Sequence, residues 1–235
     1  MTEGRTVLVT GASKGIGLRT AERFAARDDV TQLVLVARSS RAFEDAVARV
    51  SALNPAVAVS ARPFDLADRP GIRGLVRDVH AAHGNVDVLV NNAGYTNPQP
   101  IHQIRFEEFE RTMAVNLYAP FTIVQELLRL GNRFEVVVNV ASTAGIQGRS
   151  GWLTYSASKA AVINMSEVMR EELAIYGTRV VCISPGRTAT DLRRTLAPDE
   201  DPSTIMQPEH VAQVIEMLST DVGRFVDSTN LVVRQ

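Results

Sequence analysis

Short runs of β-branched and other apolar residues alternate along this chain with longer segments whose apolar residues recur at helical spacing. This alternation predicts a parallel sheet, because each return to a parallel strand needs a crossover that is usually a helix. Seven runs fit strands: RTVLVT, QLVLVA, VAVSA, VDVLV, FEVVVNV, RVVCIS and NLVVR. The expected fold is therefore an α/β, doubly wound parallel sheet of about seven strands with helices on both faces.

The whole chain is expected to form one domain, residues 1–235. Hydrophobic residues make up 45% of the sequence, which suffices for a substantial core. We find no internal repeat, low-complexity tract or linker that would divide the chain. The most loop-like segment is APDEDPSTIMQP at 197–208, between the sixth strand and the last long helix, and we expect a mobile surface loop there.

Composition argues against several classes of function. The formal net charge of −1 leaves no basic stripe for nucleic acid, and the apolar runs are too short to span a bilayer. The N-terminus passes directly into a strand without the sections of a signal peptide, so we expect a cytoplasmic protein. Cys182 lies in an apolar run and is interpreted as a buried structural thiol, while the four histidines lack partners at metal-ligand spacing. No metal is therefore expected.

A glycine-rich turn follows the first predicted strand in TGASKGIG, residues 10–17. Its glycines at 11, 15 and 17 allow a sharp turn and a close approach of backbone to ligand. The helix that begins there presents free N–H groups and its positive end, which attract a pyrophosphate. Many strand-to-helix turns carry glycine for packing alone, but this position in an alternating pattern favours a Rossmann-like dinucleotide site.

Charge at the end of the second strand indicates which dinucleotide is bound. NAD sites of this kind carry an Asp or Glu there for the ribose 2′-hydroxyl. This strand instead ends in LVLVARSSR, without an acid, so Arg38 can hold a 2′-phosphate with its planar guanidinium. Lys14 within the glycine loop adds a second positive charge. NADP is therefore favoured over NAD, although either cation could instead be a solvated surface residue.

The segment YSASK at 155–159 places a phenol and an ammonium group four positions apart. On a helix these side chains share a face. The phenol of tyrosine has an ordinary pKa of about 10, and a nearby cation lowers it. Lys159 is therefore predicted to tune Tyr155 for proton transfer, although a solvated pair on a surface helix would give the same pattern.

Four motifs in order now resemble the short-chain dehydrogenase/reductase family, in its compact single-domain branch. They are TGASKGIG, NNAG at 91–94, a serine at 142 and YSASK, with PGRTATD at 185–191 similar to the family's segment beside the nicotinamide. The resemblance implies that Tyr155 is the general acid in ketone reduction and the base in the reverse reaction. Lys159 would also hold the ribose hydroxyls, and Ser142 would hydrogen-bond the substrate oxygen.

The resemblance also implies roles for several further positions. Asn116 would anchor a water that links the lysine to solvent, or form a structural kink instead. Asp65 would accept from the adenine amino group, while Asn91 with Gly94 would border the adenosine ribose, unless Asn91 is a strand-end cap. The expected cofactor contacts, from charge and resemblance together, are Gly11, Ser13, Lys14, Gly15, Ile16, Gly17, Arg38, Asp65, Leu66, Asn91, Ala93, Gly94, Tyr155, Lys159, Pro185, Gly186, Thr188 and Thr190.

The substrate pocket is expected between Ser142, Tyr155 and the loop near 191–207. Candidate lining residues are Tyr95, Ile146, Gln147 and Trp152, the last of which could instead anchor the core. They suggest a small, mostly apolar carbonyl or alcohol. The family's long helices would correspond to about 106–130 and 153–176, and their use as subunit contacts implies a homodimer or homotetramer.

The favoured function is thus an NADP-dependent oxidoreductase that transfers a hydride between nicotinamide and a carbonyl or alcohol. One alternative is a non-catalytic NADP-binding regulatory or scaffold protein, which would have no need of all three of Ser142, Tyr155 and Lys159. Another is a 3-oxoacyl thioester reductase, but the acidic segment REELAIYG would suit an acidic carrier protein poorly. A sugar-nucleotide epimerase or dehydratase is disfavoured because few residues follow the motifs.

Overall fold

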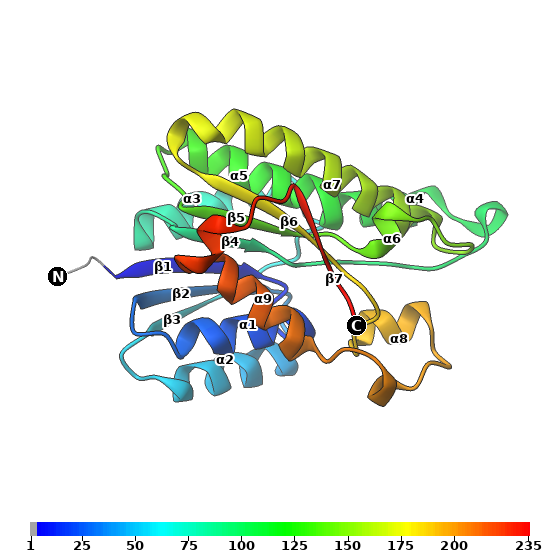
Figure 1. The fold of residues 1–235 in the computed structure, drawn as a ribbon, viewed down its shortest axis with the longest axis horizontal. Coiled ribbons are helices and arrows are strands. Elements are labelled where there is room, and N and C mark those ends of the chain that lie inside the picture. The colour runs from blue at the N-terminus through cyan, green and yellow to red at the C-terminus, as the bar shows by residue number, and fades with distance from the viewer. Residues whose placement is uncertain (1–3) are drawn as a thin grey trace.

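The computed structural model describes residues 4–235, and in it all seven predicted strands form a single parallel sheet (Figure 1). The strand order is β3-β2-β1-β4-β5-β6-β7. The strands are β1 (Arg5–Thr10), β2 (Val30–Ala37), β3 (Ala58–Pro63), β4 (Val88–Asn91), β5 (Val136–Val140), β6 (Arg179–Pro185) and β7 (Asn230–Val233). The predicted Rossmann-like sheet is confirmed.

The strand order creates a crevice beside β1. From β1 the chain winds outward through β2 and β3, then returns to place β4 against the other side of β1. The connections after β1 and after β4 therefore diverge at the carboxyl edge of the sheet. Ligands of open α/β sheets bind at such a switch point.

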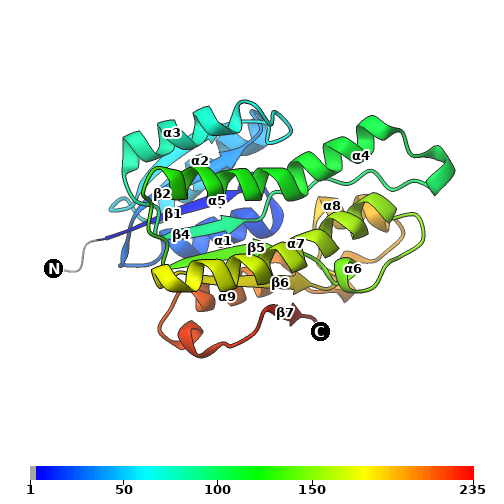
Figure 2. The same cartoon turned by 90° about the horizontal axis from the view of Figure 1, so that it is seen from above.

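Helices cover both faces of the sheet (Figures 1 and 2). One face carries α1, α2 and α9, and the other carries α3, α5 and α7, with α4 leading into α5. The helices are α1 (Gly15–Ala25), α2 (Arg41–Leu53), α3 (Ile72–His83), α4 (Phe106–Met113), α5 (Ala119–Arg129), α6 (Thr143–Ile146), α7 (Leu153–Leu173), α8 (Asp191–Leu196) and α9 (Pro208–Leu218).

Alternate residues of each strand supply the two cores. On β1, Val7 and Val9 pack with Phe24 of α1 and Ile215 of α9, whereas Leu8 packs on the opposite side with α3, α5 and α7. All of these side chains are nearly or fully buried. The central strands β1, β4 and β5 are continuous apolar runs because they are covered on both faces, whereas no residue of the edge strand β3 is fully buried.

Two segments differ from the sequence expectation. The helix expected over about 106–130 is interrupted by one π-helical turn, Ala114–Tyr118, between α4 and α5. The segment 191–207, expected as a loop, begins with the short helix α8. Its end is also anchored, because Ile205 and Met206 are buried and Met206 forms a β-bridge with Thr188.

The structure also bears on the cysteine, on membrane-spanning helices and on groups of metal ligands. Cys182 on β6 is buried, as predicted, and burial raises the pKa of its thiol to about 11. Within residues 4–235, no helix is both long and apolar enough to cross a membrane. In the same part of the chain, no three His, Cys, Asp or Glu residues are grouped so as to hold a metal ion.

Candidate active site

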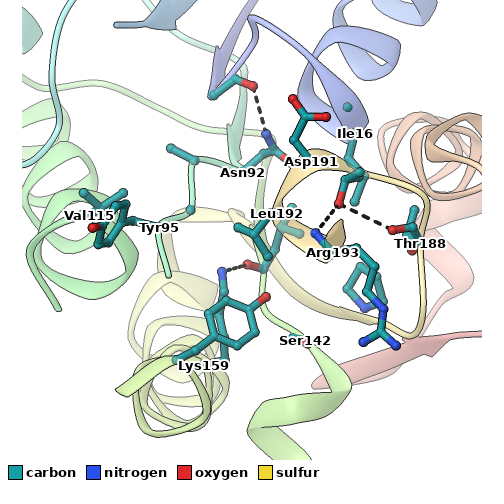
Figure 3. A pocket seen from close by; sticks show the side chains of 18 of the residues that line it. Ile16, Asn92, Tyr95, Val115, Ser142, Lys159, Thr188, Asp191, Leu192 and Arg193 are labelled. Carbon is teal, nitrogen blue, oxygen red and sulfur yellow. Dashed lines mark hydrogen bonds between the residues drawn. The ribbon is translucent and has the colours of Figure 1, made fainter. Parts of the chain in front are cut away.

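A cavity of about 250 Å³ opens at the carboxyl edge of the sheet (Figure 3). The segments that follow the six strands β1 to β6 all contribute to its walls. Helix α8 covers one side, where Leu192 and Arg193 face the cavity, while Lys159 of α7 lies opposite them (Figure 3). The topology therefore gathers residues from six strand ends around one pocket.

The glycine loop after β1 forms one end of the cavity. Gly11 and Gly15 have positive φ values of 68° and 57°, a conformation that favours glycine. A Cβ on Gly17 would lie 2.3 Å from the carbonyl oxygen of Gly11, so the loop can pack on the start of α1 only with glycine there. The first turn of α1 carries no acidic residue and Lys14 makes no side-chain cap, which suits the binding of an anion.

Charged residues surround this end of the cavity. Arg38 lines the cavity and has no ion-pair or hydrogen-bond partner among residues 4–235. The ammonium of Lys14 lies 2.5 Å from Asp191, so it links the glycine loop to the start of α8. Asp65 accepts from the backbone N–H of Ala67, and its other oxygen lies 3.2 Å from Arg111.

The other end of the cavity holds Ser142, Tyr155 and Lys159. Ser142 follows β5 and caps α6, where its hydroxyl accepts from the backbone N–H of Ala144 at 3.1 Å. A Cβ on Gly145 would lie 2.6 Å from the backbone of Lys159, so glycine lets α6 pack directly on α7. This contact brings the Ser142 hydroxyl into hydrogen-bonding reach of the Tyr155 phenol.

Lys159 is buried one turn after Tyr155 on α7. Its ammonium donates to the carbonyl of Val140 at 2.7 Å and lies 5.8 Å from the centre of the Tyr155 ring. A buried hydrogen bond of this kind fixes the amine beside the phenol, at the end of β5. The spacing of four residues therefore places both groups on one helical face, as predicted.

Comparison with known proteins decides the family. The model of the short chain dehydrogenase family matches residues 5–201. This chain belongs to the short-chain dehydrogenase/reductase family. It is 33% identical over 235 residues to a 3-oxoacyl-[acyl-carrier-protein] reductase of Thermotoga maritima, covering 95% of this chain and 94% of that protein.

Solved structures share the fold. A blue fluorescent protein from a metagenomic library, in complex with NADPH, has a TM-score of 0.86 and 27% identity, covering 98% of this chain and 96% of that one. An NAD⁺-bound xylitol dehydrogenase has a TM-score of 0.84 and 27% identity, covering 99% and 98%. The chain thus resembles proteins that bind either nicotinamide dinucleotide.

The pKa of the Tyr155 phenol is shifted in the opposite direction from that expected from the sequence. Burial raises the pKa of its phenol, and the hydrogen bond with Ser142 and the positive charge of Arg193 only partly offset this. Lys159 was expected to lower the pKa of the phenol, but it is not among the groups that do so. Burial lowers the pKa of Lys159 itself to about 8, and its ammonium is directed to the Val140 carbonyl.

Asn116 occupies the π-helical turn, where it is buried and does not line the main cavity. Its carboxamide oxygen accepts from the backbone N–H of Tyr95 at 2.7 Å. Its nitrogen donates to the Tyr95 carbonyl at 3.0 Å and to the Ser158 hydroxyl at 2.9 Å. In this structure Asn116 ties the loop after β4 to α7, which agrees with a role as a structural kink.

Most of the other predicted residues line the cavity of this short-chain dehydrogenase, but four do not. Gly17 lies beneath the loop, and Ile146 and Gln147 are exposed outside the cavity. Asn91 is buried below it and donates to Asn139 at 2.9 Å. The predicted residues that do line it are Gly11, Ser13, Lys14, Gly15, Ile16, Arg38, Asp65, Leu66, Ala93, Gly94, Tyr95, Ser142, Trp152, Tyr155, Lys159, Pro185, Gly186, Thr188 and Thr190.

Sequence reasoning missed several residues of the site. Asn92, rather than Asn91, lines the cavity, and its carboxamide donates to the carbonyls of Thr10 and Gly11. The doubled asparagine in NNAG signals this position but does not say which side chain leaves the sheet. Arg149 and Arg193 also line the cavity, and no motif marks either of them.

Proposed function

We propose that this chain is an NADP-dependent oxidoreductase that transfers a hydride between the nicotinamide and a carbonyl or alcohol substrate. The observation that carries the proposal is the shared cavity of Ser142, Tyr155 and Lys159 with the glycine loop at its other end. Its membership of the short-chain dehydrogenase family supports the same reaction class. When bound, the cofactor supplies or accepts the hydride.

The chain's own residues would handle the proton and the substrate oxygen. Tyr155 donates its phenolic proton to the oxygen of a ketone during reduction, and takes a proton from the alcohol in the reverse direction. Ser142 donates a hydrogen bond to the same oxygen, where negative charge develops. Lys159, whose ammonium lies 5.8 Å from the centre of the Tyr155 ring, would hold the ribose hydroxyls of the cofactor.

The residues present fit NADP. The positive φ values of Gly11 and Gly15 leave a cradle open at the start of α1, where a pyrophosphate would bind. At the end of β2, Arg38 faces the cavity without a carboxylate partner among the described residues, so its guanidinium is available to a 2′-phosphate. Asp65 and Leu66 would border the adenine, and Thr188 and Thr190 the nicotinamide end.

A 3-oxoacyl thioester reductase remains a second candidate, favoured by the 33% identity to the Thermotoga maritima protein over nearly the whole chain. The surface at the end of α7 argues against an acidic carrier protein, because Glu171 and Glu172 are exposed there. A non-catalytic scaffold is disfavoured because it would not need a buried tyrosine and lysine beside Ser142.

The test is Tyr155→Phe, followed through NADPH absorbance with ketones, diketones, quinones and 3-oxoacyl thioesters. The variant lacks the transferable proton and should keep NADPH binding while losing at least a hundredfold in kcat. Tyr176→Phe, at an exposed tyrosine after α7, is the matched control and should keep full activity. A Tyr155→Phe variant with more than about a tenth of the wild-type kcat would exclude Tyr155 as the proton donor.

A further inference from the structure

The cavity is lined by far more positive than negative side chains. Two carboxylates line it, Asp65 and Asp191, and both lie beside a cation. The seven cationic side chains are Lys14, Arg38, Arg111, Arg149, Lys159, Arg187 and Arg193. Lys14 and Arg38 lie at the cofactor end, and Arg111 pairs with Asp65. Lys159 and Arg193 lie near Tyr155, and Arg149 shares the Trp152 ring with Arg193. A small apolar substrate does not explain the positive charge at this end.

Two of these arginines lie on the same aromatic ring. The guanidinium carbon of Arg193 is 5.4 Å from the centre of the Trp152 ring, and that of Arg149 is 5.8 Å from it. All three side chains line the cavity together with Ser142 and Tyr155. An indole face attracts cations, so it holds both guanidinium groups at the wall of the cavity.

The two arginines differ in their partners. Arg193 makes two hydrogen bonds to the carboxylate of Glu200, at 2.5 and 2.7 Å, and Glu200 also lies 3.3 Å from Arg187. One carboxylate is thus shared by two arginines. Arg149 is exposed and has no carboxylate partner among residues 4–235. Its guanidinium lies near the indole and makes no side-chain hydrogen bond within residues 4–235, so its N–H groups can bind a ligand.

We propose that the substrate of this site carries an anionic group, a carboxylate or a phosphate, bound by Arg149 while the reacting carbonyl lies at Tyr155. The proposal rests on the proposed function and specifies its substrate class. A guanidinium matches both anions because it can donate two parallel hydrogen bonds. Arg193 adds positive charge near the phenol, and the carboxylate of Glu200 that it binds is shared with Arg187. Substrates with a neutral end leave this charge unused.

The experiment compares matched acids and esters. Wild-type protein with NADPH is given 2-, 3-, 4- and 5-oxo carboxylates of increasing length together with their methyl esters. A second pair compares acetoacetyl-coenzyme A, which carries phosphates, with the neutral acetoacetyl-N-acetylcysteamine. This pair tests whether the anionic group is a phosphate. For at least one pair, kcat/KM should favour the charged member by tenfold or more.

Variants assign the preference to Arg149. Arg149→Gln should lower the charged-to-neutral ratio of kcat/KM at least tenfold with NADPH binding unchanged, and Arg149→Lys should restore part of it. Arg133→Gln is the matched control, because Arg133 lies 5.4 Å from the centre of the Tyr176 ring and does not line the cavity. Its ratio should equal that of the wild type.

The outcomes separate this proposal from the proposed function. If neutral members are reduced as well as charged members in every pair, the enzyme is an oxidoreductase but the anionic substrate is wrong. The anionic substrate is also wrong if Arg149→Gln slows both members equally, because Arg149 then serves only to hold Trp152. If NADPH is bound and no compound of the wider carbonyl panel is reduced, the proposed function itself fails.

Discussion

Lys159 combines an amine that is almost completely buried with a single backbone acceptor, the Val140 carbonyl. Burial lowers its pKa to about 8, whereas the amine of an unfolded chain keeps an ordinary pKa of about 10.5. Between these values the unfolded state binds more protons than the folded state. The free energy of unfolding must therefore rise with pH in this window.

We predict that the contribution of Lys159 to the free energy of unfolding increases by about 1 kcal/mol from pH 8 to pH 9. Above pH 9 the raised pKa of Cys182, about 11, acts in the opposite direction. Urea unfolding of the wild type and Lys159→Met at both pH values measures the effect. The variant should lack this increase, and an equal pH dependence in both proteins would contradict the low pKa.

We predict that Arg38 determines the preference of the enzyme for NADPH over NADH. Arg38→Asp removes a contact to the 2′-phosphate and adds a repulsion, so the NADPH to NADH ratio of kcat/KM should fall at least tenfold. Arg224→Asp makes the same change of charge at an exposed residue that does not line the cavity, and it should leave the ratio unchanged. Both are measured with one substrate at one ionic strength. A wild-type protein that prefers NADH would contradict the assignment of NADP as the cofactor.

Individual residues were predictable where a local pattern marks them. The four-residue spacing identified Tyr155 and Lys159, because helix geometry alone places such side chains on one face. The pKa of Tyr155 was predicted in the wrong direction, since burial depends on how α6, α7 and α8 pack. Arg193 and Arg149 could not be recognised at all, because only tertiary structure brings them to Trp152.

Helix α8 is held over the cavity mainly by polar contacts. It contains no buried residue, while Lys14 pairs with Asp191 at its start and Glu200 binds Arg193. A Cβ on Gly15 would lie 3.3 Å from the Thr190 side chain, so the start of α8 lies close over the glycine loop. Beyond the helix, the buried Ile205 and Met206 anchor the chain. The segment is suited to open and close about this anchor.

We predict that amides in 191–204 exchange rapidly without ligand and become protected by NADPH with a substrate analogue. Amides in 205–218 should be protected in both states, because that peptide includes the buried anchor and α9. Hydrogen exchange with mass spectrometry distinguishes the two peptides. Equal protection of 191–204 with and without ligands would argue against a movable cover.

The elements differ in how well the sequence predicts them. Buried parallel strands such as β1 and β5 are continuous apolar runs, and all seven strands were predicted. The six-residue helix α8 was missed because it is too short to show a helical period, and its contacts come from distant residues. The π-helical turn contains Asn116, which donates to Tyr95 and Ser158, and hydrophobic periodicity does not reveal such tertiary hydrogen bonds.

At the scale of the whole molecule, α4, α5 and α7 lie on the same face of the sheet (Figure 2). Large apolar side chains are exposed on α4, α5 and α7. Phe106 of α4 is 67% exposed, Phe121 of α5 is 45% exposed and Val168 of α7 is 49% exposed. Exposed apolar groups on neighbouring helices are typical of an interaction surface. Residues 106–130 and 153–176 are also the segments expected to form subunit contacts.

We predict that copies of this chain associate through the surface formed by α4, α5 and α7. Light scattering after gel filtration should give two or four times the chain mass of 25.6 kDa. The double variant Phe121→Glu with Val168→Glu places charges where apolar groups would be buried, and it should lower the measured mass at least by half. Leu53→Glu is the control, because Leu53 is 51% exposed at the end of α2 on the opposite face. A wild-type mass of 25.6 kDa, or a double variant that keeps the wild-type mass, would show that this surface does not join subunits.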